Sequence, residues 1–332
     1  MILRIKGLTL LLILFAIKPL QALQGQDIDI FTKDRVQKFR IRTVTLFEYD
    51  YVNGKPETKG IKAEVDSFDT QGQKILQVNY REDGSIMSIA TFKYDSWGNK
   101  TEILKQSTDD RDKSRLVLNY SLSVRYDSKG NKMLETGFNG VEDFKNVYNY
   151  NREGKLAEVN FFIRKRLDEK RVVVSTDEQS TNMKILDGFG TLKYMLRYNY
   201  NTDGKVTEET RIENDNSISQ RIVYTYDKNG VLSGEAKYIN EKLLHKISYV
   251  YNPKGLLSEI YKETPESGRF LISKYLYDEN NQIKEFQWRE EANKEFSRSI
   301  FTYDASGLCK TVDSYYARYK RQVLSVYIYT FY

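Results

Sequence analysis

We predict an all-β protein built from antiparallel β-hairpins that repeat about every 26 residues and form a large curled sheet, barrel or shell. Three observations predict this fold: a turn motif that recurs along the chain, a large residue two positions before most copies of it, and a looser turn about 14 residues after it. A spacing of two places both side chains on one face of a strand. One period therefore predicts a strand, a tight turn, a second strand and a variable turn.

The start of the chain differs in composition from the rest. Arg4 and Lys6 precede an apolar run from Leu8 to Ile17, and Ala22 offers a small residue for cleavage. This run is shorter than the ~20 residues that span a bilayer. We expect residues 1–22 to be a secretory signal peptide, with an uncleaved anchor as the alternative. We expect residues 23–44 to be an N-terminal lead, and 45–332 to be the repeat domain.

Charge and cysteine content exclude some classes of protein. Without residues 1–22 the chain has 49 basic and 46 acidic residues, which is too even a balance to indicate a nucleic-acid partner. Cys309 is the only cysteine, so an intramolecular disulfide is excluded. An exported chain of this composition has to be stabilised by its core and its hydrogen bonds.

The repeated motif is an aromatic residue followed by Asp or Asn, two variable residues and, in most copies, Gly. Its spacings are 26, 32, 24, 50, 26, 25, 26 and 26. The value of 50 is two periods with one copy lost, and the value of 32 contains a polar insertion at 105–114. The aromatic residue of each copy is called its anchor here; the anchors are Phe68, Tyr94, Tyr126, Tyr150, Tyr200, Tyr226, Tyr251, Tyr277 and Tyr303.

The motif has the chemistry of a hairpin turn. Asp or Asn at the first position accepts hydrogen bonds from backbone N–H groups inside the turn. Gly at the fourth position adopts the left-handed conformation that lets a second strand follow. A single hairpin is marginally stable in water, so neighbouring repeats have to stack and pair their edges. So many strands should curl into a barrel or shell.

Two segments deviate from the repeat. Residues 163–195 have the length of a repeat but lack an anchor near 175, and we interpret them as a degenerate repeat, with a functional loop as the alternative. The sequence LDGFG at 186–190 is interpreted there as a shifted turn. Tyr329 lies one period after Tyr303, so the last strand is expected to be an edge strand or a closing strand.

The motif resembles the YD repeats of the RHS family, to which bacterial toxin shells and animal teneurins belong. The matching residues are Tyr94, Asp95 and Gly98, together with the copies at 126–130, 226–230 and 303–307. The resemblance covers about residues 45–332 and implies a β-hairpin sheet around a hollow interior. Similar repeats occur in small exported proteins with a porin-like barrel fold, which this chain resembles more closely in size.

Residues with catalytic chemistry are few. His245 is the only histidine, and zinc sites need several His or Cys ligands. We therefore predict no catalytic residue, no metal site and no cofactor. Trp97, at a turn tip, is a candidate platform for a carbohydrate or a partner, or else packs over the adjacent hairpin. A glutamate eight residues after the anchor is either a cross-strand ion-pair partner or part of an acidic stripe that lines the interior and binds a ligand; this set is Glu102, Glu158, Glu208, Glu259 and Glu285.

Three classes of function remain open. We expect an exported, non-catalytic repeat protein that acts as a binding or scaffold module at the cell surface or in the periplasm, with an unknown protein or glycan of the cell envelope as partner. The first alternative is an outer-membrane β-barrel, which antiparallel strands and an aromatic C-terminus favour. In KVTEETRIE, however, Lys205, Glu209 and Arg211 lie on one strand face, which a lipid-facing wall disfavours. The second alternative is a carbohydrate-active enzyme that uses paired acids.

Overall fold

The computed structural model describes residues 30–109, 112 and 115–332, so the predicted signal peptide lies outside the described residues. These residues form one short helix and a sheet of 23 strands. The elements are α2 (Lys33–Lys38), β1 (Ile41–Val52), β2 (Lys55–Pro56), β3 (Ile61–Phe68), β4 (Lys74–Tyr80), β5 (Ile86–Tyr94), β6 (Lys100–Thr108), β7 (Leu116–Tyr126), β8 (Lys132–Phe138), β9 (Asp143–Tyr150), β10 (Leu156–Ile163), β11 (Arg166–Thr176), β12 (Ser180–Asp187), β13 (Leu192–Tyr200), β14 (Val206–Ile212), β15 (Ile218–Tyr226), β16 (Leu232–Ile239), β17 (Lys242–Tyr251), β18 (Leu257–Thr264), β19 (Gly268–Tyr277), β20 (Ile283–Trp288), β21 (Ser297–Tyr303), β22 (Cys309–Tyr316) and β23 (Arg321–Phe331).

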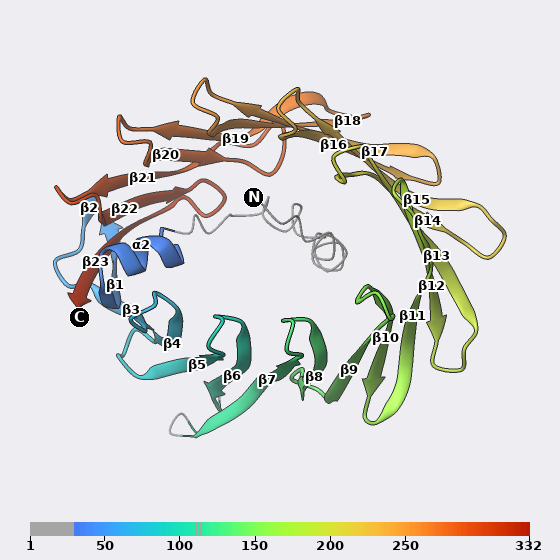
Figure 1. Ribbon diagram of the computed structural model, residues 1–332. Coiled ribbons are helices and arrows are strands. Elements are labelled where there is room, and N and C mark those ends of the chain that lie inside the picture. The colour runs from blue at the N-terminus through green and yellow to red at the C-terminus, as the bar shows by residue number, and fades with distance from the viewer. Residues whose placement is uncertain (1–29, 110–111, 113–114) are drawn as a thin grey trace.

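The sheet closes on itself. From β3 to β23 each strand pairs with the next one in antiparallel fashion, and β1 pairs with both β3 and β23. The short strand β2 pairs only with the end of β1 and stands outside this ring. Figure 1 shows the resulting barrel, viewed into its interior. The predicted all-β hairpin fold is confirmed, and the last strand is a closing strand.

The repeated motif forms the same turn in successive hairpins. In the turn after β5, the Oδ1 atom of Asp95 accepts hydrogen bonds from the backbone N–H groups of Trp97 (2.9 Å) and Asn99 (2.8 Å). Gly98 has a φ of 82°, which residues with a side chain rarely adopt. Asn281 replaces glycine in one copy and has a φ of 63°. The Asp and Gly residues of the motif therefore serve to hold the backbone of the turn in its conformation.

The anchor tyrosines join neighbouring hairpins through their hydroxyl groups. Tyr251, for example, donates to the carbonyl oxygen of Leu232 (2.8 Å), and Leu232 is the strand partner of the preceding anchor, Tyr226. Tyr94, Tyr126, Tyr150, Tyr226, Tyr277, Tyr303 and Tyr329 make the equivalent bond. This hydroxyl ladder explains why the anchor is a tyrosine in most copies, since a phenylalanine fills the same space without donating.

The irregular segment 163–195 contains a complete hairpin, β11 and β12. Its turn begins at Asp177, whose Oδ1 accepts from the N–H groups of Gln179 and Ser180, and it lacks the anchor and the glycine of the repeat. The hydroxyl of Tyr200, the next anchor, donates to no backbone carbonyl of this hairpin among the described residues, and the side chain of Thr181 lies beside it. The LDGFG sequence forms an anchor-type turn around Asp187, at the barrel end opposite to the other anchor turns.

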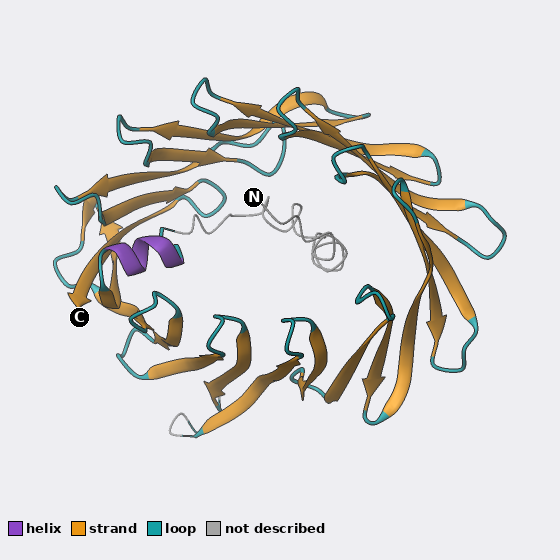
Figure 2. Cartoon of the chain, viewed as in Figure 1, coloured by secondary structure: helices purple, strands orange, loops and turns teal. Residues whose placement is uncertain are grey.

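Helix α2 identifies the inner face of the sheet. It lies inside the ring of strands (Figures 1 and 2). Its residue Val36 is fully buried in a cluster with Phe68 and Tyr329, two residues at anchor positions, and with Tyr327 two positions before the latter. Anchor positions therefore face inward, and because side chains alternate along a strand, so do the positions two residues before them.

Candidate functional site

The inner wall combines tyrosines with carboxylates at one repeated position. In each anchor hairpin, the residue two positions before the anchor pairs with the residue nine positions after it. Both therefore face inward. In three repeats the ninth residue is a glutamate: Glu135, Glu209 and Glu235. Their repeat position is one beyond that of the predicted acidic set, so they are not members of it.

Glu135 is saturated by donors from the protein itself. Its Oε1 is 2.6 Å from the ammonium of Lys132, and its Oε2 accepts from Asn146 (2.9 Å) and the hydroxyl of Tyr148 (2.7 Å). The Lys132 ammonium also lies 5.5 Å from the centroid of the Tyr148 ring. Burial alone would raise the pKa of Glu135, but these hydrogen bonds outweigh it and lower the pKa.

Glu209 and Glu235 lack those donors. The position of Lys132 is taken by Val206 and Leu232 in their repeats, and the position of Asn146 is taken by aliphatic residues, Ile222 opposite Glu209 and Ile247 opposite Glu235. Neither carboxylate has a hydrogen-bond or ion-pair partner within the described part of the chain. The Glu235 residue is only 6% exposed. Burial raises the pKa of both carboxyl groups, opposed only by the charge of Lys237.

Aromatic and basic groups surround this carboxylate pair. Tyr224 lies between the two and feels the charge of both, which together with burial raises its pKa; Tyr198 and Tyr249 flank the pair. Lys237 lies beside His245 on the next strand. His245 is buried, its Nε2 atom has no partner in the described residues, and burial together with Lys262 and Lys237 lowers its pKa. Glu209, Glu235 and His245 together form a site on the inner wall whose polar groups lack hydrogen-bond partners among the described residues.

The glutamates predicted from the sequence lie on the opposite, outer face. A β-bulge after each anchor turn reverses the alternation: Leu156 pairs with Tyr150, but Glu158 pairs with Asn149. Because of this bulge these glutamates lie on the face opposite to the anchors, so they do not line the interior as an acidic stripe. Their contacts are with Lys93 for Glu102 (2.8 Å), Lys170 for Glu158 (2.6 Å), Arg221 for Glu208 (3.8 Å), Tyr261 for Glu259 (2.8 Å) and Gln287 for Glu285 (2.7 Å).

Trp97 lies at the tip of its turn and is largely exposed. Its ring lies over the next anchor turn, because a Cβ atom built on Gly130 would meet it at 3.8 Å. The residue thus covers the neighbouring hairpin on one side and presents the remainder of the indole to solvent. Its predicted role in ligand binding stays a prediction.

The sequence contained a signal for the inward glutamates that was missed. Glu135, Glu209 and Glu235 are all nine residues after an anchor, one position beyond the predicted set. The tight turn with Gly at its fourth position is the type that ends in a bulge. Counting the bulge as one extra residue moves the inward position from eight to nine.

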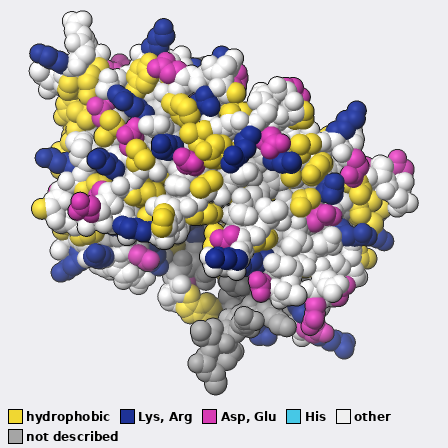
Figure 3. Space-filling view, turned by 90° about the horizontal axis from the view of Figure 1, so that it is seen from above, with side chains coloured by type: hydrophobic (Ala, Val, Ile, Leu, Met, Phe, Trp, Pro, Cys, Tyr) yellow, Lys and Arg dark blue, Asp and Glu magenta, His cyan; other side chains and the backbone are white. Residues whose placement is uncertain are grey.

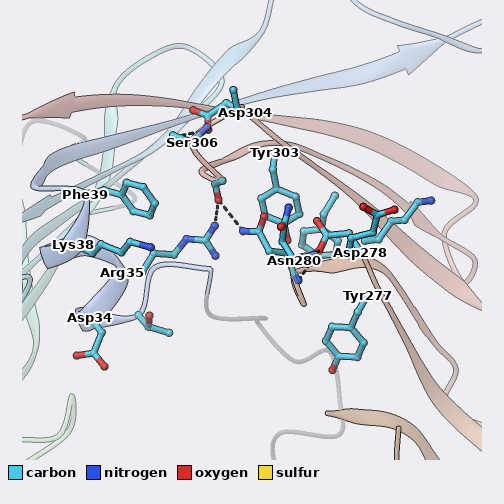
Figure 4. Close-up of a pocket in the computed structure, with 17 residues that line it drawn as sticks. Asp34, Arg35, Lys38, Phe39, Tyr277, Asp278, Asn280, Tyr303, Asp304 and Ser306 are labelled. Carbon is cyan, nitrogen blue, oxygen red and sulfur yellow. Dashed lines mark hydrogen bonds between the residues drawn. The ribbon is translucent and has the colours of Figure 1, made fainter. Parts of the chain in front are cut away.

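An open pocket of about 1100 Å³ lies between helix α2 and two anchor turns. Figure 4 shows the guanidinium of Arg35 at its centre, donating to the carbonyl oxygen of Gly307, which also accepts from Gln282 (2.8 Å). Arg35 also lies over the Tyr303 ring, 5.7 Å from its centroid. The guanidinium of Arg35 is thus already bound to the barrel. We interpret its contacts as attaching helix α2 to the end of the barrel.

The described residues contain neither a metal-binding cluster nor a membrane-spanning helix. Within residues 30–109, 112 and 115–332, no group of three or more His, Cys, Asp or Glu residues is arranged to hold a metal ion. In the same part of the chain, no helix has the length and apolar character needed to cross a membrane.

Comparison with known proteins gives structural similarity only. No family model and no curated protein matches the chain. A porin-like protein from Bacteroides uniformis is 9% identical with a TM-score of 0.32, covering 87% of this chain and 98% of its own. A porin-like protein from Bacteroides vulgatus is 10% identical with a TM-score of 0.23, covering 68% and 94%. The crystal structure of TcdB2-TccC3-Cdc42 is 12% identical with a TM-score of 0.26; the match covers 79% of this chain and 17% of that one. The barrel is thus established by its own strand pairing.

Proposed function

We propose that this protein is an exported, water-soluble β-barrel that binds a ligand on its inner wall, as a non-catalytic binding or scaffold module of the cell surface or periplasm. The observation that carries the proposal is the charge on the outer wall. Ion pairs join outward side chains of successive strands around the barrel: Lys93 with Glu102, Lys170 with Glu158, Arg221 with Glu208 and Lys246 with Glu263.

Lipid would penalise such a wall. A membrane barrel has an apolar outer band about 25 Å tall, and a Lys or Arg at its midplane costs about 2–4 kcal/mol. Figure 3 shows Lys, Arg, Asp and Glu side chains interspersed among apolar ones over the wall at the top of Figure 1. In water these charges are solvated, and each cross-strand ion pair contributes a few tenths of a kcal/mol to about 1 kcal/mol to the stability of the sheet.

The non-catalytic part of the proposal rests on periodicity. The turn aspartates are used by the backbone, as at Asp95, and the inward glutamates recur at one repeat position. An acid–base enzyme needs two unlike carboxyl groups whose surroundings push their pKa values apart. Glu209 and Glu235 have like surroundings and pKa values shifted in the same direction.

Fractionation tests the proposal against the outer-membrane alternative, which the closed ring of antiparallel strands favours. The full chain is expressed in a bacterium with two membranes, and the periplasmic and membrane fractions are separated without detergent. We expect the processed protein in the soluble fraction. Recovery only after detergent extraction would support the outer-membrane barrel and reject a soluble module. Pull-down of envelope proteins and glycans with the processed protein then identifies the partner class.

A further inference from the structure

We propose that Glu209 and Glu235 form a binding site for a ligand with two or more primary ammonium groups, such as a diamine or a polyamine. The inference rests on the proposed function, because it names the ligand of the same inner wall. It is carried by a comparison within the chain: the equivalent carboxylate, Glu135, has its partners built in, and at Glu209 and Glu235 those partners are missing.

The built-in site shows which chemistry fits the carboxylate. At Glu135 an ammonium group, that of Lys132, lies 2.6 Å from one oxygen and over the face of the Tyr148 ring, and the hydroxyl of Tyr148 contacts the other oxygen. Cations are attracted to the face of an aromatic ring, and an ionised pair strengthens each hydrogen bond. Tyr224 and Tyr249 occupy the position of Tyr148 beside Glu209 and Glu235. An ammonium group from outside would complete the same arrangement.

Glu235 is nearly buried and Glu209 is half-buried. A nearly buried carboxylate without a hydrogen bond is costly to the fold, so a cation from outside would stabilise the ionised form of Glu235. The partnerless atoms that are closed off from solvent among the described residues belong to Asp66, Tyr200, Arg221 and His245, and not to either glutamate. The carboxylate oxygens of both glutamates therefore keep some exposure to solvent, which leaves an approach for a small cation.

The spacing of the pair selects a ligand with two ammonium groups. Glu209 is on β14 and Glu235 is on β16, at the same position of consecutive repeats, with β15 between them. Glu209 lies opposite Ile222 of β15 and Glu235 lies opposite Tyr224, two residues further along. With neighbouring strands about 4.8 Å apart and a rise of about 3.4 Å per residue, the two backbone positions are separated by about 12 Å. Tyr224, on the strand between them, feels the charge of both carboxylates. One flexible chain with an ammonium group at each end spans such a pair, and joining two weak contacts raises the affinity of the whole.

Lys237 is the competing cation. It faces inward next to Ile222 and lowers the pKa of both carboxyl groups by its charge, but it forms no ion pair with either within the described residues. Removal of the Lys237 charge should increase the affinity for the ligand, since its ammonium groups would no longer be repelled by that of Lys237. If the two carboxylates serve only to neutralise Lys237, removal of the Lys237 charge should instead weaken ligand binding. The carboxyl groups would then be protonated and would not bind an amine.

The test is calorimetric titration of the processed protein with spermidine, n-butylamine and glucose. We expect spermidine to bind more tightly than n-butylamine, and glucose not to bind. Glu209→Gln and Glu235→Gln should each weaken spermidine binding about tenfold to a hundredfold, since each removes one charge-assisted contact. Glu208→Gln, one residue away on the outer face, is the matched control and should leave the affinity unchanged. Lys237→Met should increase it.

Three outcomes overturn the inference: no amine binding, equal losses for Glu208→Gln and Glu209→Gln, or displacement of spermidine by glucose. Glucose binding would reject the amine site and still support a soluble binding module, whereas recovery of the protein only with detergent would reject the module and not the site. Circular dichroism checks the fold of each variant. If a variant does not fold, titration of the wild-type protein in buffers of different ionisation enthalpy replaces it. Proton release on amine binding is then the expected result, and its absence overturns the inference.

Discussion

The hydroxyl of Tyr332 donates a hydrogen bond to the carbonyl oxygen of Phe68, 264 residues earlier in the chain. Phe68 is the first anchor and the only one without a hydroxyl. One period after Tyr303, Tyr329 donates to the carbonyl oxygen of Cys309, as the hydroxyl ladder requires. A tyrosine hydroxyl therefore also bridges the seam of the barrel, where β1 lies between β23 and β3. Its acceptor is the anchor Phe68 itself, whereas each ladder bond goes to the strand partner of the preceding anchor.

Loss of one hydroxyl from the ladder should weaken the barrel. Tyr251→Phe removes the bond to Leu232 and leaves a half-buried carbonyl oxygen without its donor, so we expect a loss of about 0.5–1.5 kcal/mol in the free energy of unfolding. Tyr200→Phe is the matched control, since the Tyr200 hydroxyl donates to no carbonyl of the preceding hairpin among the described residues, and the change should be neutral. Urea denaturation followed by tyrosine and tryptophan fluorescence measures both. Equal effects at the two positions would rule out the ladder.

Docking of helix α2 should depend on Gly72. This residue has a φ of 76°, and a Cβ atom there would lie 2.5 Å from the carbonyl oxygen of Lys33. Gly84 has a φ of 80° with nothing within 4 Å of its Cβ position. Both Gly→Ala changes incur the left-handed backbone cost of about 1–2 kcal/mol, but only Gly72→Ala should release the helix. Trypsin should then cleave at Lys33, Arg35 or Lys38 faster in Gly72→Ala, and comparable cleavage of the two variants would contradict the prediction.

The thiol of Cys309 should report opening of the barrel. Burial raises its pKa to about 12, so the thiolate that reacts with disulfide reagents is scarce at pH 8. We expect no labelling of the native protein by a chromogenic disulfide reagent within an hour, and complete labelling in urea. Rapid labelling without denaturant would show that the strand pair around Tyr303 and Cys309 opens in the native protein.

The turns were predictable because their chemistry is local. Asp95, Gly98 and their equivalents specify a conformation over five residues, so their spacing predicts the hairpins and their number. Closure of the sheet could not be predicted, because it depends on twist and curvature summed over all strands and on the pairing of Val44 with Tyr329. Helix α2 was not predicted: a helix of six residues is stabilised by its contacts with Phe68 and Tyr329 and not by its own sequence.

The candidate site could be predicted only in part. Repetition of glutamates after the anchor was visible, but assignment of a face required the bulge, which shifts Glu158 outward and leaves the ninth position inward. That Glu235 lacks partners could not be predicted for a further reason. They depend on Leu232 and Ile247, which take the places that Lys132 and Asn146 hold beside Glu135 in an earlier repeat. Only the register aligns these positions.

The stability of the inner wall should respond to pH in opposite directions at two equivalent carboxylates. The folded-state pKa of Glu235 is raised above its ordinary value of 4.5, so folding is penalised as pH rises from that value through the raised one. The groups that face it are Tyr224, Tyr249 and Lys237. Glu235→Gln should therefore be more stable than the wild-type protein at pH 7 and equal to it at pH 4.

Glu135 shows the opposite sign. Its folded-state pKa is lowered, so its contribution is present above the ordinary pKa and is lost as pH falls through the lowered one. Glu135→Gln leaves the buried Lys132 without its counter-ion, and we expect a loss of about 3–5 kcal/mol at pH 7 that shrinks in acid. Urea denaturation of the two variants between pH 4 and 8 measures both curves. If the curves run in parallel, the two carboxylates have like surroundings, and the contrast between a filled and an unfilled amine site is rejected.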